Sequence, residues 1–135
     1  MPVSSPFEAI STTEAPAAIG PYSQAVSVGE LVIASGQIAL DPETGVMVSG
    51  GVAEQTRQVL TNLKAVLAAA GCGLDQVLRC TVYMLDLSAF AEMNMIYGEF
   101  FSEPYPSRAA VEVARLPRDG LVEIDAIAAR TSGTA

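Results

Sequence analysis

Apolar and polar positions along the chain alternate with a period that changes several times, and each change indicates a new element. Stretches with a period of two, rich in β-branched and aromatic residues, predict strands at 22–28, 31–38, 78–85 and 121–129. A further strand is predicted to start at Pro106 and to carry Arg108. The short turn Gly29-Glu30 suggests that the first two strands form a hairpin.

Helical spacing appears in two places between these strands. Apolar residues recur every three or four positions over 52–70, where Gly71 and Gly73 end the predicted helix. A second helix is predicted from about 89 to 101, with Asp86 to Ser88 offering N-cap side chains and Asn94 on its apolar stripe. The order β-β-α-β-α-β-β predicts a single α+β domain, 1–135, with two helices on one face of the sheet and flexible ends at 1–11 and 131–135.

Charged residues interrupt two of the predicted strands. Alternation in the last strand places Glu123 and Asp125 together on one face, and Arg108 is an isolated cation in an apolar run. A guanidinium matches a carboxylate in shape and charge, so Arg108 is a candidate carboxylate-binding residue. The alternative is two solvent-exposed faces with weak ion pairs. In a simple hairpin of these two strands, Glu123 would lie roughly 17 Å from the position opposite Arg108. Either the strands are not hairpin partners or the pocket forms another way, for example between subunits.

Composition narrows the possible chemistry. The formal net charge of −8 opposes binding to nucleic acid, and the basic residues are scattered. The chain has no His, and the spacing of Cys72 and Cys80 fits neither a redox pair nor a zinc site, so we expect reduced thiols and no metal. The N-terminus lacks a signal or membrane segment, which predicts a cytoplasmic protein with no membrane association. Charged residues make up only 16%, against roughly 25% in typical domains, which suggests that part of the surface is a subunit interface.

Five sequence blocks, in order, resemble the RidA family, also called YjgF/YER057c/UK114. They are Ala17-Ala18-Ile19-Gly20-Pro21-Tyr22-Ser23-Gln24-Ala25, Ala34-Ser35-Gly36-Gln37-Ile38, Phe90-Ala91-Glu92-Met93-Asn94, the stretch from Pro106 to Pro117, and Glu123 to Ala128. The resemblance covers nearly all of 12–130. It implies a chorismate-mutase-like fold and a homotrimer with a central β-barrel and pockets between subunits.

The same resemblance implies hydrolytic deamination of 2-imino acids, such as 2-iminobutanoate and 2-iminopropanoate, to 2-oxo acids and ammonia, without a cofactor. Arg108 would bind the substrate carboxylate and Glu123 would orient the attacking water. Tyr22, Ser35 and Gly36 match pocket-lining positions of the family, and Asn94 matches a helix residue near the pocket. Ala110 occupies a further position that would bind substrate. The resemblance also implies a functional link to the PLP-dependent dehydratases that release such imines.

Ala110 departs from the family pattern, because many members have Cys at this position. A thiol role there is therefore not expected, although the backbone N–H of Ala110 could still donate to the carboxylate. Three alternatives to the hydrolysis of 2-iminobutanoate and 2-iminopropanoate remain: an endoribonuclease or translation inhibitor, a non-catalytic protein that binds small carboxylates, and a deaminase of another imine such as an aminomuconate.

Overall fold

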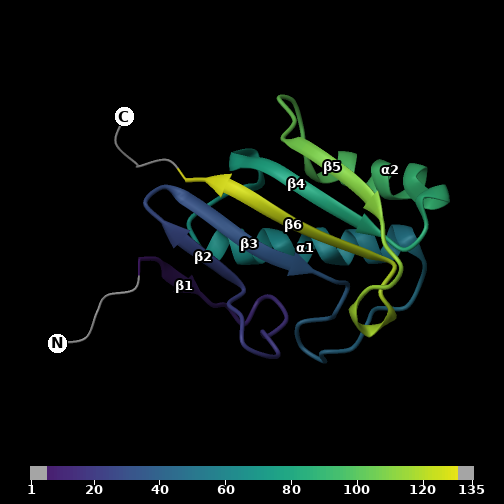
Figure 1. The fold of residues 1–135 in the computed structure, drawn as a ribbon, viewed down its shortest axis with the longest axis horizontal. Helices are drawn as coiled ribbons and strands as arrows, with labels where there is room; N and C mark the ends of the chain where they lie inside the picture. The colour runs from purple at the N-terminus through teal and green to yellow at the C-terminus, as the bar shows by residue number, and fades with distance from the viewer. Residues whose placement is uncertain (1–5, 131–135) are drawn as a thin grey trace.

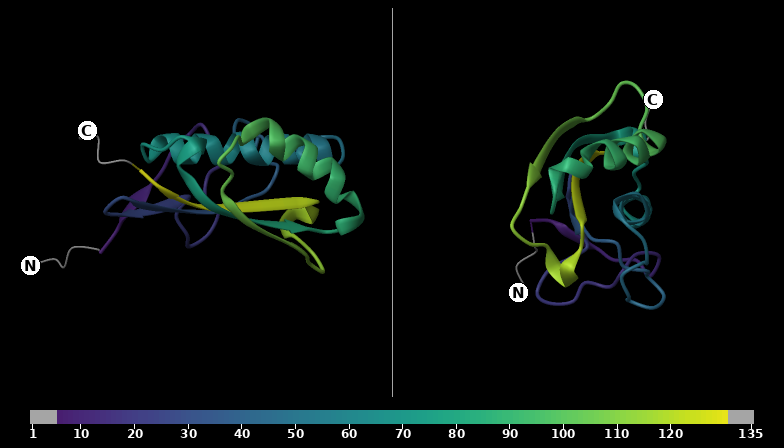
Figure 2. Two further views of the ribbon diagram at one scale, coloured as in Figure 1. Left: turned by 90° about the horizontal axis from the view of Figure 1, so that it is seen from above. Right: turned by 90° about the vertical axis from the view of Figure 1, so that its right-hand side faces the viewer.

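The fold is taken from a computed structural model, in which residues 6–130 are described. These residues form a six-stranded mixed sheet in the order β1-β2-β3-β6-β4-β5, with two α-helices on one face (Figures 1 and 2). The elements are β1 (Glu8–Ile10), β2 (Ala25–Val28), β3 (Leu31–Gln37), α1 (Val52–Ala69), β4 (Val77–Met84), α2 (Phe90–Phe100), β5 (Ser107–Glu112) and β6 (Val122–Ala129). The predicted α+β sheet with two helices on one face is therefore confirmed.

The N-terminal part differs from the prediction in two respects. Segment 1–11, predicted to be a flexible end, contains β1, which pairs antiparallel with β2 and places Ala9 opposite Val26. Residues 1–5 and 131–135 lie outside the described residues. The second strand begins at Ala25 instead of 22, because Tyr22 lies in a turn in which its N–H donates to the Gly20 carbonyl at 2.9 Å.

The core lies between the two helices and the sheet. Helix α1 buries a continuous apolar face made of Val59, Leu60, Leu63, Val66 and Leu67. Asn62 on the same face is fully buried, and its amide donates to the carbonyls of Ile38 and Leu40 at 3.3 and 2.9 Å. These bonds tie the helix to the segment that follows β3, since a buried amide must find partners.

The topology shows how the strand that carries Arg108 is placed. β4, α2 and β5 form a crossover in which β4 and β5 are parallel, and β6 is inserted antiparallel between β3 and β4. β5 and β6 are therefore not neighbours, so the simple hairpin is excluded. Both thiols are free and buried, and Cys80 lies in the core on β4.

Candidate functional site

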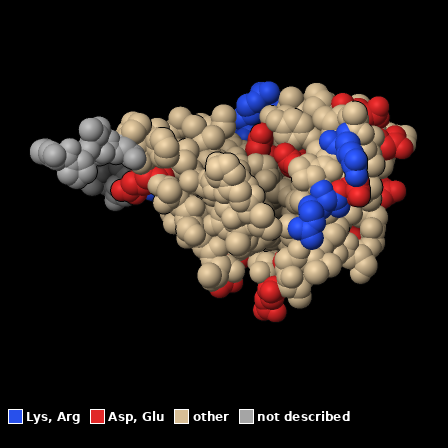
Figure 3. All heavy atoms as spheres, turned by 60° about the horizontal axis from the view of Figure 1, so that its bottom comes forward, with Lys and Arg blue, Asp and Glu red and all other residues tan. Residues whose placement is uncertain are grey.

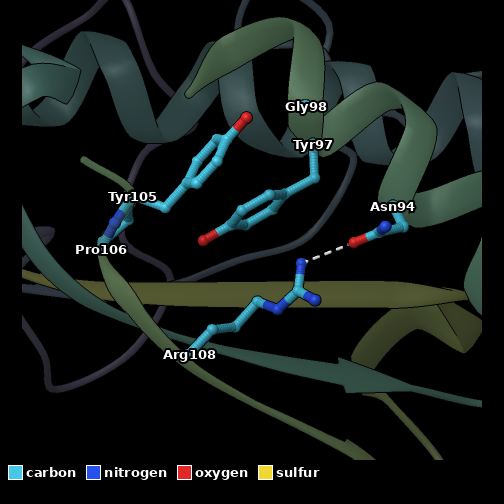
Figure 4. Close-up of a pocket in the computed structure, with 6 residues that line it drawn as sticks. All are labelled: Asn94, Tyr97, Gly98, Tyr105, Pro106 and Arg108. Atoms are coloured by element: carbon cyan, nitrogen blue, oxygen red, sulfur yellow. Dashed lines mark hydrogen bonds between the residues drawn. The ribbon is translucent and has the colours of Figure 1, made fainter. Parts of the chain in front are cut away.

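Arg108 points from β5 toward α2 on the helix-covered side of the sheet. Its Nη1 donates to Asn94 Oδ1 at 2.7 Å, and its guanidinium carbon lies 4.8 Å from the ring centroid of Tyr97 and 5.3 Å from that of Phe90. Figure 4 shows the guanidinium below the Tyr97 ring with Asn94 beside it. The residues bordering this cavity of about 480 Å³ are Asn94, Tyr97, Gly98, Tyr105, Pro106 and Arg108.

The groups around Arg108 are neutral. No carboxylate within residues 6–130 forms an ion pair with it. Burial raises the pKa of Cys80, which pairs with Arg108 across the two strands, to about 11, and burial also raises the pKa of Tyr97. The guanidinium charge therefore lacks a counter-charge in the described chain, which is the arrangement expected of a group that receives an anion.

Glu123 lies on the opposite, open side of the sheet. It pairs with Tyr83 of β4, and its half-buried carboxyl rests against Gly36 of β3. A Cβ at position 36 would lie only 2.9 Å from Glu123 Cδ, so the glycine makes room for the carboxyl. Burial, and secondarily the nearby charge of Asp125, raise the pKa of Glu123. A carboxylate poised in this way suits orientation of a water molecule.

Ser35 and Tyr22 lie on the same side of the sheet as Glu123, but their side chains have different surroundings. The register of β3 against β6 shifts between Ala34 and Gln37, which places Ser35 and Gly36 in a bulge. Ser35 Oγ donates to the Ser23 carbonyl at 2.7 Å, so its hydroxyl fixes the loop that precedes β2. Tyr22 is 53% exposed and lines a hollow of about 230 Å³ together with Gly36 and Arg118.

Ala110 does not line the cavity beside Arg108. It pairs with Val82, is half-buried, and packs against the core. Its side chain therefore fills space beneath the helices. The Ala110 side chain does not border this cavity, and a contact of its backbone N–H with a carboxylate stays a prediction.

The single chain does not bring Arg108 and Glu123 together. Arg108 is aligned with Cys80 and Ala126, both buried under the helices, whereas Glu123 is aligned with Tyr83 and Val111. Directly paired residues share a face of a sheet, and adjacent rows alternate between faces. The two candidate catalytic residues thus lie on opposite faces and three rows apart, which is about 10 Å along the strands.

Sequence reasoning missed the aromatic neighbours of Arg108. Phe90 and Tyr97 belong to the predicted apolar stripe of α2, but nothing in the local pattern links them to the cation. The available signal is the spacing of Phe90, Asn94 and Tyr97, at intervals of four and three, which places them on one face of the helix.

Metal-binding clusters and membrane-spanning helices are both absent from the described part of the chain. Between residues 6 and 130, no group of three or more His, Cys, Asp or Glu side chains could hold a metal ion. None of the helices in this range has the length and apolar character needed to cross a bilayer.

The fold and the cavity define a class of small α+β proteins in which an arginine borders a pocket. In this chain the arginine is Arg108, which has no ion-pair partner within residues 6–130. The family model described as Endoribonuclease L-PSP matches residues 12–130. A RutC family protein of Pyrococcus abyssi is 53% identical, with 90% of this chain and 95% of that protein covered. The 2-iminobutanoate/2-iminopropanoate deaminase of Bos taurus is 50% identical, with 88% and 87% covered.

A solved structure agrees with these matches. RidA from an Antarctic Psychrobacter superimposes with a TM-score of 0.88 at 48% identity, covering 90% of this chain and 98% of that one. The chain belongs to the RidA family, as its sequence motifs predicted.

Proposed function

We propose that this protein hydrolyses 2-imino acids, such as 2-iminobutanoate and 2-iminopropanoate, to 2-oxo acids and ammonia. The observation that carries the proposal is the Arg108 guanidinium, which borders a cavity and has no ion-pair partner in residues 6–130. The deaminase name of the bovine relative at 50% identity supports the same activity.

In the proposed reaction, Arg108 binds the substrate carboxylate and Glu123 orients a water molecule. The water oxygen forms a bond to the imine carbon while the C=N π pair moves to nitrogen. Glu123 accepts one proton of the water and passes it to the amine nitrogen of the resulting carbinolamine. When the remaining hydroxyl proton is lost to solvent, a C=O bond forms and ammonia leaves with the C–N electron pair. A protonated imine is already electrophilic, so fixed charges and orientation suffice in a chain without His.

We further propose that the complete site forms between subunits of a homotrimer. Since Arg108 and Glu123 lie on opposite faces of one sheet, a second copy of the chain is needed to bring them together. The open face also exposes apolar side chains, among them Ile33 at 42% and Val111 at 41%. Uncharged residues cover most of the surface seen in Figure 3, and the charged side chains lie mainly toward its right side, with a few acidic ones at the left and lower edges. Exposed apolar surface of this kind is typical of subunit interfaces.

The proposed setting is the cytoplasm, where PLP-dependent dehydratases would release the imine. The endoribonuclease alternative is disfavoured by the net charge of −8, because binding to a phosphate backbone needs clustered cations.

A coupled assay tests the proposal. The protein is added to a PLP-dependent threonine dehydratase in the presence of semicarbazide, which traps the imine, and formation of 2-oxobutanoate is measured. We expect the protein to accelerate 2-oxobutanoate formation and to reduce the trapped product. If the 2-oxobutanoate rate is unchanged while 2-oxobutanoate itself still binds, the protein binds small carboxylates without catalysis.

A further inference from the structure

Three side chains of α2 converge on Arg108 from one helix face. Phe90 and Tyr97 present ring faces to the guanidinium at 5.3 and 4.8 Å, and Asn94 accepts a hydrogen bond at 2.7 Å. No other described residue is in an ion pair or a hydrogen bond with the Arg108 side chain. The orientation of the guanidinium is therefore set by this helix face.

Tyr97 is the most firmly held of the three. It is 5% exposed, and the Phe101 ring packs behind it with the centroids 4.6 Å apart. Its hydroxyl is buried beside Cys80, where burial raises the pKa and keeps the phenol neutral. In Figure 4 the ring, and not the hydroxyl, lies over the guanidinium. Tyr97 thus meets the cation with a fixed aromatic surface.

An aromatic surface can orient the Arg108 guanidinium without neutralising its charge. A carboxylate in this position would orient Arg108 but also neutralise it and compete with the substrate. Ring faces attract the cation while leaving the donors in the guanidinium plane unused. The Asn94 carbonyl engages one Nη and leaves the remaining donors of the guanidinium to the ligand.

We propose that Tyr97 is a positioning residue for Arg108. Its ring, supported by Phe90, fixes the plane of the guanidinium so that the donor fork is already oriented when a carboxylate arrives. The inference rests on the proposed function only in taking a carboxylate as the ligand. Fixing the fork in advance lowers the entropic cost of binding, so losing the ring weakens binding of substrate and product alike.

The test compares Tyr97→Phe with Tyr97→Leu. Tyr97→Phe keeps the ring, and we expect KM for 2-iminobutanoate and Kd for 2-oxobutanoate within about twofold of the parent protein. Tyr97→Leu removes the ring, and both constants should rise about tenfold while kcat changes less. Ile96→Ala is the matched control, because Ile96 is buried on the same helix but does not border the Arg108 cavity. It should lower the thermal midpoint without raising KM.

A readout that needs no ligand separates this inference from the proposed function. The Nε–H signal of Arg108 in a nitrogen-15 correlation spectrum, assigned by its loss in Arg108→Ala, should be displaced by the ring current of Tyr97. The displacement should persist in Tyr97→Phe and decrease in Tyr97→Leu, where only the more distant Phe90 ring remains. If the parent protein does not turn over imines, the proposed function fails but Kd and this signal still test the positioning role.

Two results would overturn the inference. In the first, Tyr97→Leu keeps the parent KM, Kd and Arg108 signal, so the ring does not orient the cation. In the second, Tyr97→Phe is damaged as much as Tyr97→Leu, which would assign the effect to the hydroxyl instead of the ring face.

Discussion

The charged residues on the two faces of the sheet, Arg108 and Glu123, have different surroundings. On the helix side, Arg108 is surrounded by an amide and two aromatic rings that orient it without neutralising it. On the open side, Glu123 is half-buried beside a second carboxylate, Asp125, and its pKa is raised. The first region suits binding of an anion, and the second holds a carboxyl with increased proton affinity.

Under the proposed function, this difference means that one chain carries two half-sites and not one complete site. The binding half, around Arg108, depends on the packing of α2. The chemical half, around Glu123, depends on the bulge in β3 that places Gly36 against the carboxyl. Variants in the two halves should therefore have separable effects on binding and on kcat.

The largest effect is expected for Arg108→Ala. Loss of the guanidinium should lower kcat/KM for 2-iminobutanoate on the order of a thousandfold, because a charge-assisted bidentate contact is removed. Arg108→Lys keeps the charge but not the fork and should cost on the order of tenfold or more. Steady-state kinetics check both values, and full turnover by Arg108→Ala would rule out the carboxylate-binding role.

Glu123→Gln should affect only the half-site around Glu123, and therefore kcat but not binding. The amide preserves size but cannot accept a proton as a carboxylate does, so kcat should drop about a hundredfold. Binding of 2-oxobutanoate, measured by calorimetry, and oligomeric mass should stay unchanged. Nearly normal turnover together with altered stability would instead assign Glu123 a structural role.

Gly36→Ala probes the contact that positions Glu123. The added methyl group would lie against the Glu123 side chain and force it to move. We expect kcat to fall about tenfold with the Kd for 2-oxobutanoate little changed, since misplacement of a catalytic group is costly. Gly51→Ala is a matched control, because Gly51 borders neither the Arg108 cavity nor the hollow beside Tyr22, and a Cβ there would meet only Glu54 Oε1, at 3.8 Å. Equal losses for both variants would contradict the positional argument.

Mixing two inactive variants tests whether the half-sites meet between chains. Arg108→Ala and Glu123→Gln, co-refolded in equal amounts, should recover about a quarter of the parent activity, because a quarter of the interfaces then combine an intact Arg108 with an intact Glu123. Light scattering should give about three times the 14.0 kDa chain mass. A monomer, or a mixture as inactive as its components, would place the site within one chain.

The smallest effect concerns pH. Burial and the charge of Asp125 raise the pKa of Glu123. Tyr83, which pairs with Glu123 across the strands and donates to Asp125 at 3.2 Å, also faces this carboxyl. The carboxylate form is needed to orient water, so kcat should fall as pH drops through this raised pKa. Asp125→Asn removes the nearby negative charge, which should lower the pKa of Glu123 and so move the acidic limb of the kcat–pH profile to lower pH.

The same raised pKa has a consequence for stability. The folded chain binds the Glu123 proton more tightly than the unfolded chain, so ionised Glu123 lowers the free energy of unfolding above the folded pKa. This cost declines as pH falls through the folded pKa and is absent below the unfolded pKa. Glu123→Gln should remove the pH dependence within that window, as measured by urea unfolding. An unaltered pH dependence would show that other groups cause it.

The elements and the faces of the strands follow from the amino-acid sequence alone. Periodicity locates both helices and five of the six strands, since a period of two or of 3.6 reflects the local backbone geometry. Alternation places Glu123 and Asp125 on one face of β6. The isolation of Arg108 in an apolar run makes it a candidate for carboxylate binding, which stays a prediction. The short strand β1 was missed because three residues carry too little periodic signal.

The choice of neighbouring strands, by contrast, depends on the tertiary structure. Alternation fixes the face of a residue but not its partner strand, so the insertion of β6 between β3 and β4 could not be predicted. That insertion places β4 between the strands that carry Arg108 and Glu123. The aromatic contacts of Arg108 likewise depend on how α2 packs over β4 and β5, because contacts between distant segments follow from packing and not from local sequence.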